Sequence, residues 1–345
     1  MRTGVFQESY GELIALVRHP TQARWTVALV VAALVAPLLL SNHLTALVNG
    51  ILIVAVGAVG LNLLIGTTGL ISFGQAGFLA VGAYTTAILA ADYGMPLWLC
   101  LPAAGLAAAT FGLLVGIPSL RLKGLYLAIT TLAFTIIITH LILTAEDFTH
   151  GSSGISTPKP ALFGLELGSD RAFYYLVLAV LTLAVLGSAN LKRSRIGRAL
   201  LAIREQDIAA RAMGVPVARY KLYAFVVSSF YAGVAGALMA YNIRFVNVDS
   251  FSMIISIEAV SIIIVGGLGS TAGAVIGSFL IIGLAELLNL AFGAMGGTVA
   301  TGSVLELKSL IYGLTIVLFL RFEPDGLMGI YRELKNRWIN WPFRY

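Results

Sequence analysis

About ten runs of apolar residues, separated by short polar segments, cover most of the chain. A helix that crosses a bilayer needs roughly 20 mostly apolar residues, and most of the runs approach that length, although some are short and rich in glycine. The pattern predicts an all-α integral membrane protein with about ten transmembrane helices, some of them short or broken. The runs 253–268 and 272–292 could form one broken pair. In chain order the runs are 25–41, 44–65, 75–92, 97–119, 124–144, 171–189, 222–242, 253–268, 272–292 and 305–321.

The composition agrees with a membrane environment. Of the 345 residues, 59% are hydrophobic and 11% are charged. Soluble domains carry about 25% charged residues, so the apolar surplus of this chain needs lipid around it. The single cysteine, Cys100, excludes an intrachain disulfide framework and a cysteine metal site.

The charged residues predict the orientation of the chain. We assign residues 1–24 to the cytoplasm because they carry arginines, and basic loops of membrane proteins stay inside. Alternation then places loop 190–221 and tail 322–345, both rich in Lys and Arg, on the same side, and the acidic loop 145–170 outside. The prediction is one transmembrane domain, 25–321, with both termini in the cytoplasm. Because the net charge of +6 comes from these basic segments, it does not indicate nucleic-acid binding.

The sequence lacks the motifs of an energy-converting or catalytic site. It has no G-x-x-x-x-G-K-[ST] phosphate loop and no array of membrane carboxylates and histidines typical of a proton relay. It also has no nucleophile with a base and no histidine pair at metal-ligand spacing. We therefore predict a transport subunit rather than an enzyme, with no metal and no cofactor of its own. If ATP drives transport, another chain hydrolyses it.

The basic loop predicts a short amphipathic helix over 198–213. Asp207 and Arg211 are spaced to pair on one helix face, Gly214 suits the left-handed position that ends a helix, and Pro216 prevents its continuation. One interpretation is a helix that lies on anionic membrane lipid. The other is a docking helix for a cytoplasmic partner.

The stretch AIREQDIAARAMGV (202–215) resembles the cytoplasmic loop of ABC importer permeases, which carries Glu-Ala-Ala, three residues and then Gly. Ala209, Ala210 and Gly214 fall on the last two alanines and the glycine. Ile208 stands where the glutamate is usual, a departure shared by one branch of the family. This departure suggests that the loop is seated there by apolar contact rather than by charge.

Further stretches resemble that branch, the LivM-type permeases of branched-chain amino acid ABC importers. They are GLNLLIGTTGLISFGQAGFLAVGAYTTAIL (60–89), GLYLAITTLAF (124–134), HGSSGI (150–155), SFSMIISIEAVSIIIVGGLGSTAGAVIG (250–277) and IYGLTIVLFLRFEPDGL (311–327). Their occurrence in this order is specific, whereas each stretch alone is weak.

The resemblance implies a subunit of an ABC importer in the bacterial cytoplasmic membrane. The implied partners are a second permease subunit of the LivH type, two cytoplasmic ATPase subunits that bind the ATP, and an extracytoplasmic substrate-binding protein. In such importers the loop helix couples closure of the ATPases to opening of the path. The residues predicted to contact the ATPase are Arg204, Glu205, Asp207, Ile208, Ala209, Ala210 and Gly214.

Two glycine-rich segments stand out. The segment 66–78 interrupts a helical run, and broken backbone at membrane depth is tolerated where it lines a cavity or is buried in protein. We hypothesise that it lies beside the translocation path, while Ser72 and Gln75 are also spaced as a capping box for the third span. The spacing of Gly269, Gly273 and Gly277 favours close helix packing. The path candidates in segment 66–78 are Thr67, Thr68, Gly69, Ser72 and Gln75.

Three ionisable residues are predicted in the outer third of the membrane, namely His140, Glu258 and Glu286. They either pair with backbone or with one another, or they line a vestibule for a zwitterion. The outer loop 145–170 is either a plain connector or a docking surface for the binding protein.

The substrate stays open at this stage. Leucine, isoleucine and valine are the usual cargo of the family, while related permeases carry other amino acids, urea or short amides. A secondary transporter or channel that works alone is a second class, and the missing proton relay argues against it. A membrane enzyme has no constellation of residues to support it.

Overall fold

Helices account for almost all of the computed structural model, which describes residues 20–122, 124–162, 165–166, 168–294, 301–323 and 325–340. The short strands pair as β1 with β4 and β2 with β3, both antiparallel. The long helices are α2 (Pro20–Leu39), α3 (Asn42–Thr68), α4 (Gln75–Ala91), α5 (Leu97–Ser119), α6 (Leu125–Thr144), α8 (Asp170–Arg193), α9 (Arg195–Glu205), α11 (Val217–Ile243), α12 (Met253–Gly266), α13 (Thr271–Ala294), α14 (Thr301–Phe322) and α15 (Gly326–Asn340). The short elements are α7 (Glu146–Thr149), η1 (Gly151–Ser153), β1 (Ile155–Ser156), β2 (Ala161–Leu162), β3 (Leu165–Glu166), α10 (Asp207–Ala212), β4 (Phe245–Val246) and η2 (Val248–Phe251).

The all-α membrane prediction is confirmed, and each predicted apolar run overlaps one of the long helices. Within the described residues, six helical segments are long and apolar enough to cross a membrane, and three shorter apolar helices accompany them. The predicted N-terminal segment 1–24 lies largely outside the described residues. The predicted tail 322–345 contains α15, a helix that the hydrophobic pattern did not indicate.

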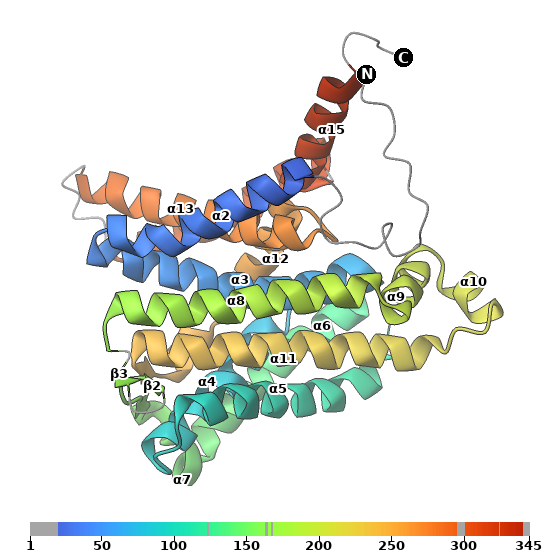
Figure 1. Ribbon diagram of the computed structural model, residues 1–345. Coiled ribbons are helices and arrows are strands. Elements are labelled where there is room, and N and C mark those ends of the chain that lie inside the picture. The colour runs from blue at the N-terminus through green and yellow to red at the C-terminus, as the bar shows by residue number, and fades with distance from the viewer. Residues whose placement is uncertain are drawn as a thin grey trace.

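The long helices run side by side, with loop 190–221 and the small strands at opposite ends of the molecule. Helix α11 lies alongside α5 and α8 lies alongside α3, and in Figure 1 α9 and α10 project at one end while β2 and β3 lie at the other. Helix α11 is central because it packs against α3, α4 and α5. This arrangement places loops 145–170 and 190–221 at opposite ends, as the charge pattern requires.

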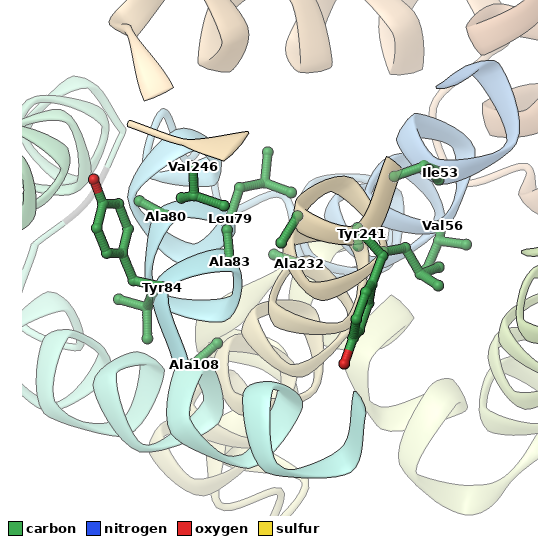
Figure 2. Packing of buried hydrophobic residues seen from close by; sticks show 14 of the residues in the cluster. Ile53, Val56, Leu79, Ala80, Ala83, Tyr84, Ala108, Ala232, Tyr241 and Val246 are labelled. Carbon is green, nitrogen blue, oxygen red and sulfur yellow. The ribbon is translucent and has the colours of Figure 1, made fainter. Parts of the chain in front are cut away.

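Small residues bring the central helices close together. Figure 2 shows Ala80 and Ala83 of α4 near Ala232 of α11, among the buried residues of the core. A Cβ built on Gly82 would lie 2.1 Å from the carbonyl oxygen of Gly233, so only hydrogen fits at that crossing. Lipid provides no hydrophobic drive between helices, and close backbone approach supplies the packing contacts instead.

Helices α4 and α12 are shorter than the hydrocarbon core is thick. Their 17 and 14 residues give lengths of about 25 and 21 Å at 1.5 Å per residue, against a hydrocarbon core of about 30 Å. Together with the preceding η2, α12 forms the segment Val248–Gly266, which is long enough to cross a membrane. The first turns of α4 and α12 meet, because the backbone N–H of Ala76 donates to the Ser256 hydroxyl at 3.0 Å.

Candidate functional site

Loop 190–221 forms two helices rather than the single helix predicted over 198–213. Helix α9 ends at Glu205 and α10 begins at Asp207, with Gln206 in an extended conformation (φ −155°, ψ 100°) between them. That prediction was wrong because an extended residue cannot continue the helical hydrogen-bond ladder. Gly214 adopts the left-handed conformation expected at the end of the loop helix, with φ 83°.

One side of α10 is held against the rest of the chain. Ala210 is 5% exposed and packs in a small cluster with Ile203 and Val217. The Asp207 carboxylate accepts a hydrogen bond from the Lys221 ammonium at 2.9 Å and lies 3.9 Å from the Arg211 guanidinium. Ala210 and Asp207, both predicted to contact the ATPase, thus make contacts within this chain that fix α10 on the start of α11.

The opposite side of α10 is apolar and exposed. Ile208 is 77% exposed and Met213 is 85% exposed, at the end of the molecule where α10 projects in Figure 1. Ala209 and Ala212 are exposed beside them, and we call these four residues the apolar tip. Sequence reasoning did not include Met213 among the contact residues. Its signal is its position directly before Gly214, where the helix has ended and the side chain turns outward.

Two further predicted contact residues flank the tip. Glu205 and Arg204 are both exposed at the end of α9. The Arg204 guanidinium turns towards the membrane helices, where it donates to the carbonyl oxygen of Gly66 in the last turn of α3. The loop therefore touches the segment that carries the predicted path residues.

Four of the five path candidates in the glycine-rich segment are buried. The hydroxyls of Thr67 and Thr68 donate back to carbonyl oxygens of their own helix, and the exposed Gly69 ends α3 with φ 72°. Ser72 and Gln75 are 1% and 3% exposed. None of the five lines either of the two pockets described below.

The predicted capping box at the start of α4 is absent. Gly74 is the N-cap and provides no side-chain bond, and the Ser72 hydroxyl accepts a hydrogen bond from the N–H of Gly74 at 3.3 Å instead. The first-turn N–H of Ala76 is satisfied by Ser256, 180 residues further along the chain. The prediction was wrong because a partner from α12 supplies the cap, and short-range spacing cannot reveal such a partner.

The three glycines of the predicted packing motif have two different environments. Gly269 lies in the turn between α12 and α13 with φ 81°. Gly273 and Gly277 lie on α13, where a built Cβ would come within 2.4 Å of the Gly266 carbonyl oxygen and 2.2 Å of the Ile262 carbonyl oxygen, respectively. The latter two thus form the contact between α12 and α13 within this chain.

A cavity of about 260 Å³ opens between α6 and the start of α12. Four of its lining residues are polar, and the rest are apolar. The lining consists of Leu132, Thr135, Ile136, Thr139, Val248, Asp249, Phe251, Ser252 and Met253. We call it the α6–α12 cavity.

None of the three predicted membrane ionisable residues lines the α6–α12 cavity. His140 directly follows the lining residue Thr139 and is exposed, Glu258 lies further along α12, and Glu286 lies on α13. The two glutamates are half-buried. Asp249 is the ionisable residue that borders the cavity, and sequence reasoning missed it because it precedes the apolar run of α12.

The outer end of the molecule carries a polar pocket of about 690 Å³. It is lined by Asn42, Gly168, Ser169, Asp170, Arg171, Asn242 and Arg244. Strand β1 of the outer loop pairs with β4 after α11, so this loop is fastened to the end of α11 rather than hanging free. Residues 163, 164 and 167 of the loop lie outside the described residues.

Comparisons with known proteins agree with this arrangement. A family model described as "Branched-chain amino acid transport system / permease component" matches residues 42–320. The chain is 37% identical to the high-affinity branched-chain amino acid transport system permease protein LivM of Escherichia coli, over 91% of this chain and 77% of that protein. It is 31% identical to the probable branched-chain amino acid transport permease protein LivH of Methanocaldococcus jannaschii, over 81% of this chain and 90% of that protein. It is 25% identical to the permease protein BraD of Pseudomonas aeruginosa, over 84% of this chain and 96% of that protein.

Proposed function

The chain belongs to the family of branched-chain amino acid transport permeases, and from this membership we propose that it is the LivM-type subunit of an ABC importer for leucine, isoleucine and valine. It is a multi-pass membrane protein, and separate cytoplasmic subunits bind and hydrolyse the ATP. A LivH-type permease completes the membrane part, and an extracytoplasmic binding protein delivers the substrate. The membrane is the bacterial cytoplasmic membrane, with both termini of the chain inside.

The observation that carries this proposal is the apolar tip. Large apolar side chains exposed in water are costly, and a patch of them at the end of a protruding element marks a contact surface. Ile208 and Met213 expose most of their surface on a loop whose neighbouring residues are charged. A membrane protein without a phosphate loop needs a surface through which a separate ATPase acts on it, and the tip supplies one.

The transport path in this proposal runs along the α6–α12 cavity and the joined beginnings of α4 and α12. Polar groups at membrane depth are tolerated where they face protein or water rather than lipid. Thr135, Thr139 and Asp249 of the cavity lining meet that condition when the cavity faces the second permease and a hydrated path. Segment 66–78 then lies one layer behind the path, where it moves when the path opens.

Reconstitution tests the proposed function. The chain is assembled with its LivH-type permease and ATPase subunits in proteoliposomes, with its cognate binding protein and ATP on the appropriate sides, and uptake of radiolabelled leucine is measured. We expect uptake that needs ATP, the binding protein and the ATPase subunits together. Uptake by the two permeases alone contradicts the proposal and favours a secondary transporter or channel. ATP-dependent uptake of urea or another amino acid, but not of leucine, identifies an importer with a different cargo.

A further inference from the structure

The turn between α12 and α13 is contacted by polar side chains from three other helices. It comprises Gly267 to Ser270, and two of its glycines have positive φ angles. A turn of this kind exposes backbone donors and acceptors that must be satisfied when they are buried. Side chains of α3 and α8 satisfy them, and an arginine of α9 lies against the turn.

The first partner is Asn62, a fully buried residue of α3. Its side-chain oxygen accepts a hydrogen bond from the N–H of Gly269 at 2.8 Å, and its side-chain nitrogen donates to the carbonyl oxygen of Ser270. A single amide thus bonds the N–H of one turn residue and the C=O of the next. The turn cannot shift relative to α3 without breaking this pair of bonds.

The second partner is Lys192, near the end of α8. Its ammonium donates to the carbonyl oxygen of Gly269 at 2.9 Å and to the hydroxyl of Thr271 at 2.8 Å. Taking an ammonium out of water is costly unless its donors are bonded. The side chain is therefore held to the turn, two residues before α9 is capped by Ser194.

The third partner is Arg204, at the other end of α9. Its guanidinium bonds the carbonyl oxygen of Gly66, where a cation is favoured by the negative end of the α3 dipole. A Cβ built on Gly269 would lie 3.4 Å from one guanidinium nitrogen, so the same group lies against the turn. Lys192 of α8 therefore bonds the turn just before α9 begins, and Arg204 lies against the turn near the end of this 11-residue helix.

We propose that Arg204 and Lys192 are positioning residues that transmit movement of the apolar tip to the α12–α13 turn, and through rigid α12 to the α6–α12 cavity. Helix α12 connects the two regions, because its last residue adjoins the turn and its first residue, Met253, lines the cavity. Rigid secondary elements carry displacement over such distances. The inference rests on the proposed function and adds the route by which ATP hydrolysis acts on the path.

The experiment compares variants of the full importer reconstituted in proteoliposomes. Arg204→Ala and Lys192→Met each remove one of the two cationic contacts, and Arg204→Lys keeps a cation with fewer donors. Arg198→Ala is the matched control, since Arg198 lies on the same helix and donates only to the neighbouring Arg193 carbonyl oxygen. Leucine uptake, ATP hydrolysis with loaded binding protein and retention of the ATPase subunits are measured for each. A second readout is the labelling rate of Thr139→Cys with and without a non-hydrolysable ATP analogue.

We expect Arg204→Ala and Lys192→Met to lower leucine uptake at least tenfold, while ATP hydrolysis stays within threefold of wild type and the ATPase subunits remain bound. Arg204→Lys should recover part of the uptake, and Arg198→Ala should resemble wild type. The ATP analogue should change thiol labelling in wild type and leave it unchanged in Arg204→Ala.

Two results overturn the inference. One is wild-type uptake and labelling in both Arg204→Ala and Lys192→Met. The other is loss of the ATPase subunits or of assembly in Arg204→Ala, Arg204→Lys and Lys192→Met alike, which assigns these residues to docking or folding instead. If the wild-type complex takes up no leucine, the proposed function fails separately, and the labelling comparison, which needs no substrate, decides on the linkage.

Discussion

Ile208 occupies the position where ABC importer permeases usually carry a glutamate, and it exposes 77% of its surface. A glutamate at that place can pair with a cation of the ATPase, whereas an isoleucine can only be buried. Full burial of an Ile or Met side chain contributes about 1.5–3 kcal/mol. Together with Met213, this makes apolar burial the main source of affinity at the tip.

Charge introduced at the tip should therefore detach the ATPase. We expect Ile208→Asp and Met213→Asp each to reduce recovery of the ATPase subunits with the affinity-purified permease at least tenfold, because a carboxylate must be desolvated at the contact. The control is Ala202→Asp, which adds the same charge at an exposed position of α9 away from the tip. Equal recovery in all three variants would show that the tip is not the contact.

The two alanines of the loop should differ sharply in reactivity. Ala209 is exposed, whereas Ala210 is 5% exposed and packed against Ile203. In a Cys100→Ala background and without ATPase subunits, we expect Ala209→Cys to react with a maleimide at least tenfold faster than Ala210→Cys. Comparable rates in folded, monodisperse protein would contradict the packing of α10 described above.

At this scale the sequence predicted the loop but not the direction of its side chains. The Gly214 and Pro216 signals are local, and they located the end of the loop helix correctly. The side chains of Arg204, Asp207 and Ala210 point to groups on other helices, which no local pattern reveals. The pattern of one continuous helix over 198–213 also gave no sign that Gln206 breaks it.

Among the elements, the α12–α13 hairpin depends most on the absence of side chains. A methyl group on Gly277 would press on the Ile262 carbonyl oxygen at 2.2 Å. Since that oxygen is held in its helix, the two helices must separate, at a typical overpacking cost of about 1–3 kcal/mol. Gly283 lies on the same helix with no atom of the described residues within 4 Å of a built Cβ.

These two glycines give a matched test of the hairpin. We expect Gly277→Ala to lower the thermal unfolding temperature of the detergent-purified protein by several degrees. Gly283→Ala should leave that temperature unchanged or raise it slightly, because alanine favours a helix by up to about 1 kcal/mol over glycine. Equal temperatures for both variants would place the close approach of α12 and α13 in doubt.

For the helices, the apolar runs of the sequence predicted position but not every detail of packing. The runs located the helices because a membrane span must satisfy its backbone internally and show an apolar surface to lipid. They did not indicate that the first turns of α4 and α12 are joined by the bond from Ala76 to Ser256. That bond links positions 180 residues apart, and it replaced the local capping box that the spacing of Ser72 and Gln75 suggested.

In the whole molecule, two short helices begin inside the bundle and leave it in opposite directions. Helix α4 begins after the end of α3 and runs towards β1, while α12 begins after η2 and runs towards the α12–α13 turn. Their shared starting point lies behind the α6–α12 cavity. A small rotation of α12 would therefore alter the cavity and the start of α4 together, which suits a path that opens and closes.

Water should reach the cavity side of α6 and not its lipid side. Thr139 lines the α6–α12 cavity, whereas Ile137, two residues earlier, is 62% exposed in the single chain and is not part of the lining. Residues two apart on a helix point in different directions. In the assembled importer with a Cys100→Ala background, we expect Thr139→Cys to react with a charged, membrane-impermeant thiol reagent at least tenfold faster than Ile137→Cys. These reagents react with the ionised thiolate, and hydrocarbon excludes both the thiolate and the water around it.

Slow labelling at both positions, with and without ATP, would assign the cavity to a lipid-facing or protein-covered surface. The path would then have to lie elsewhere.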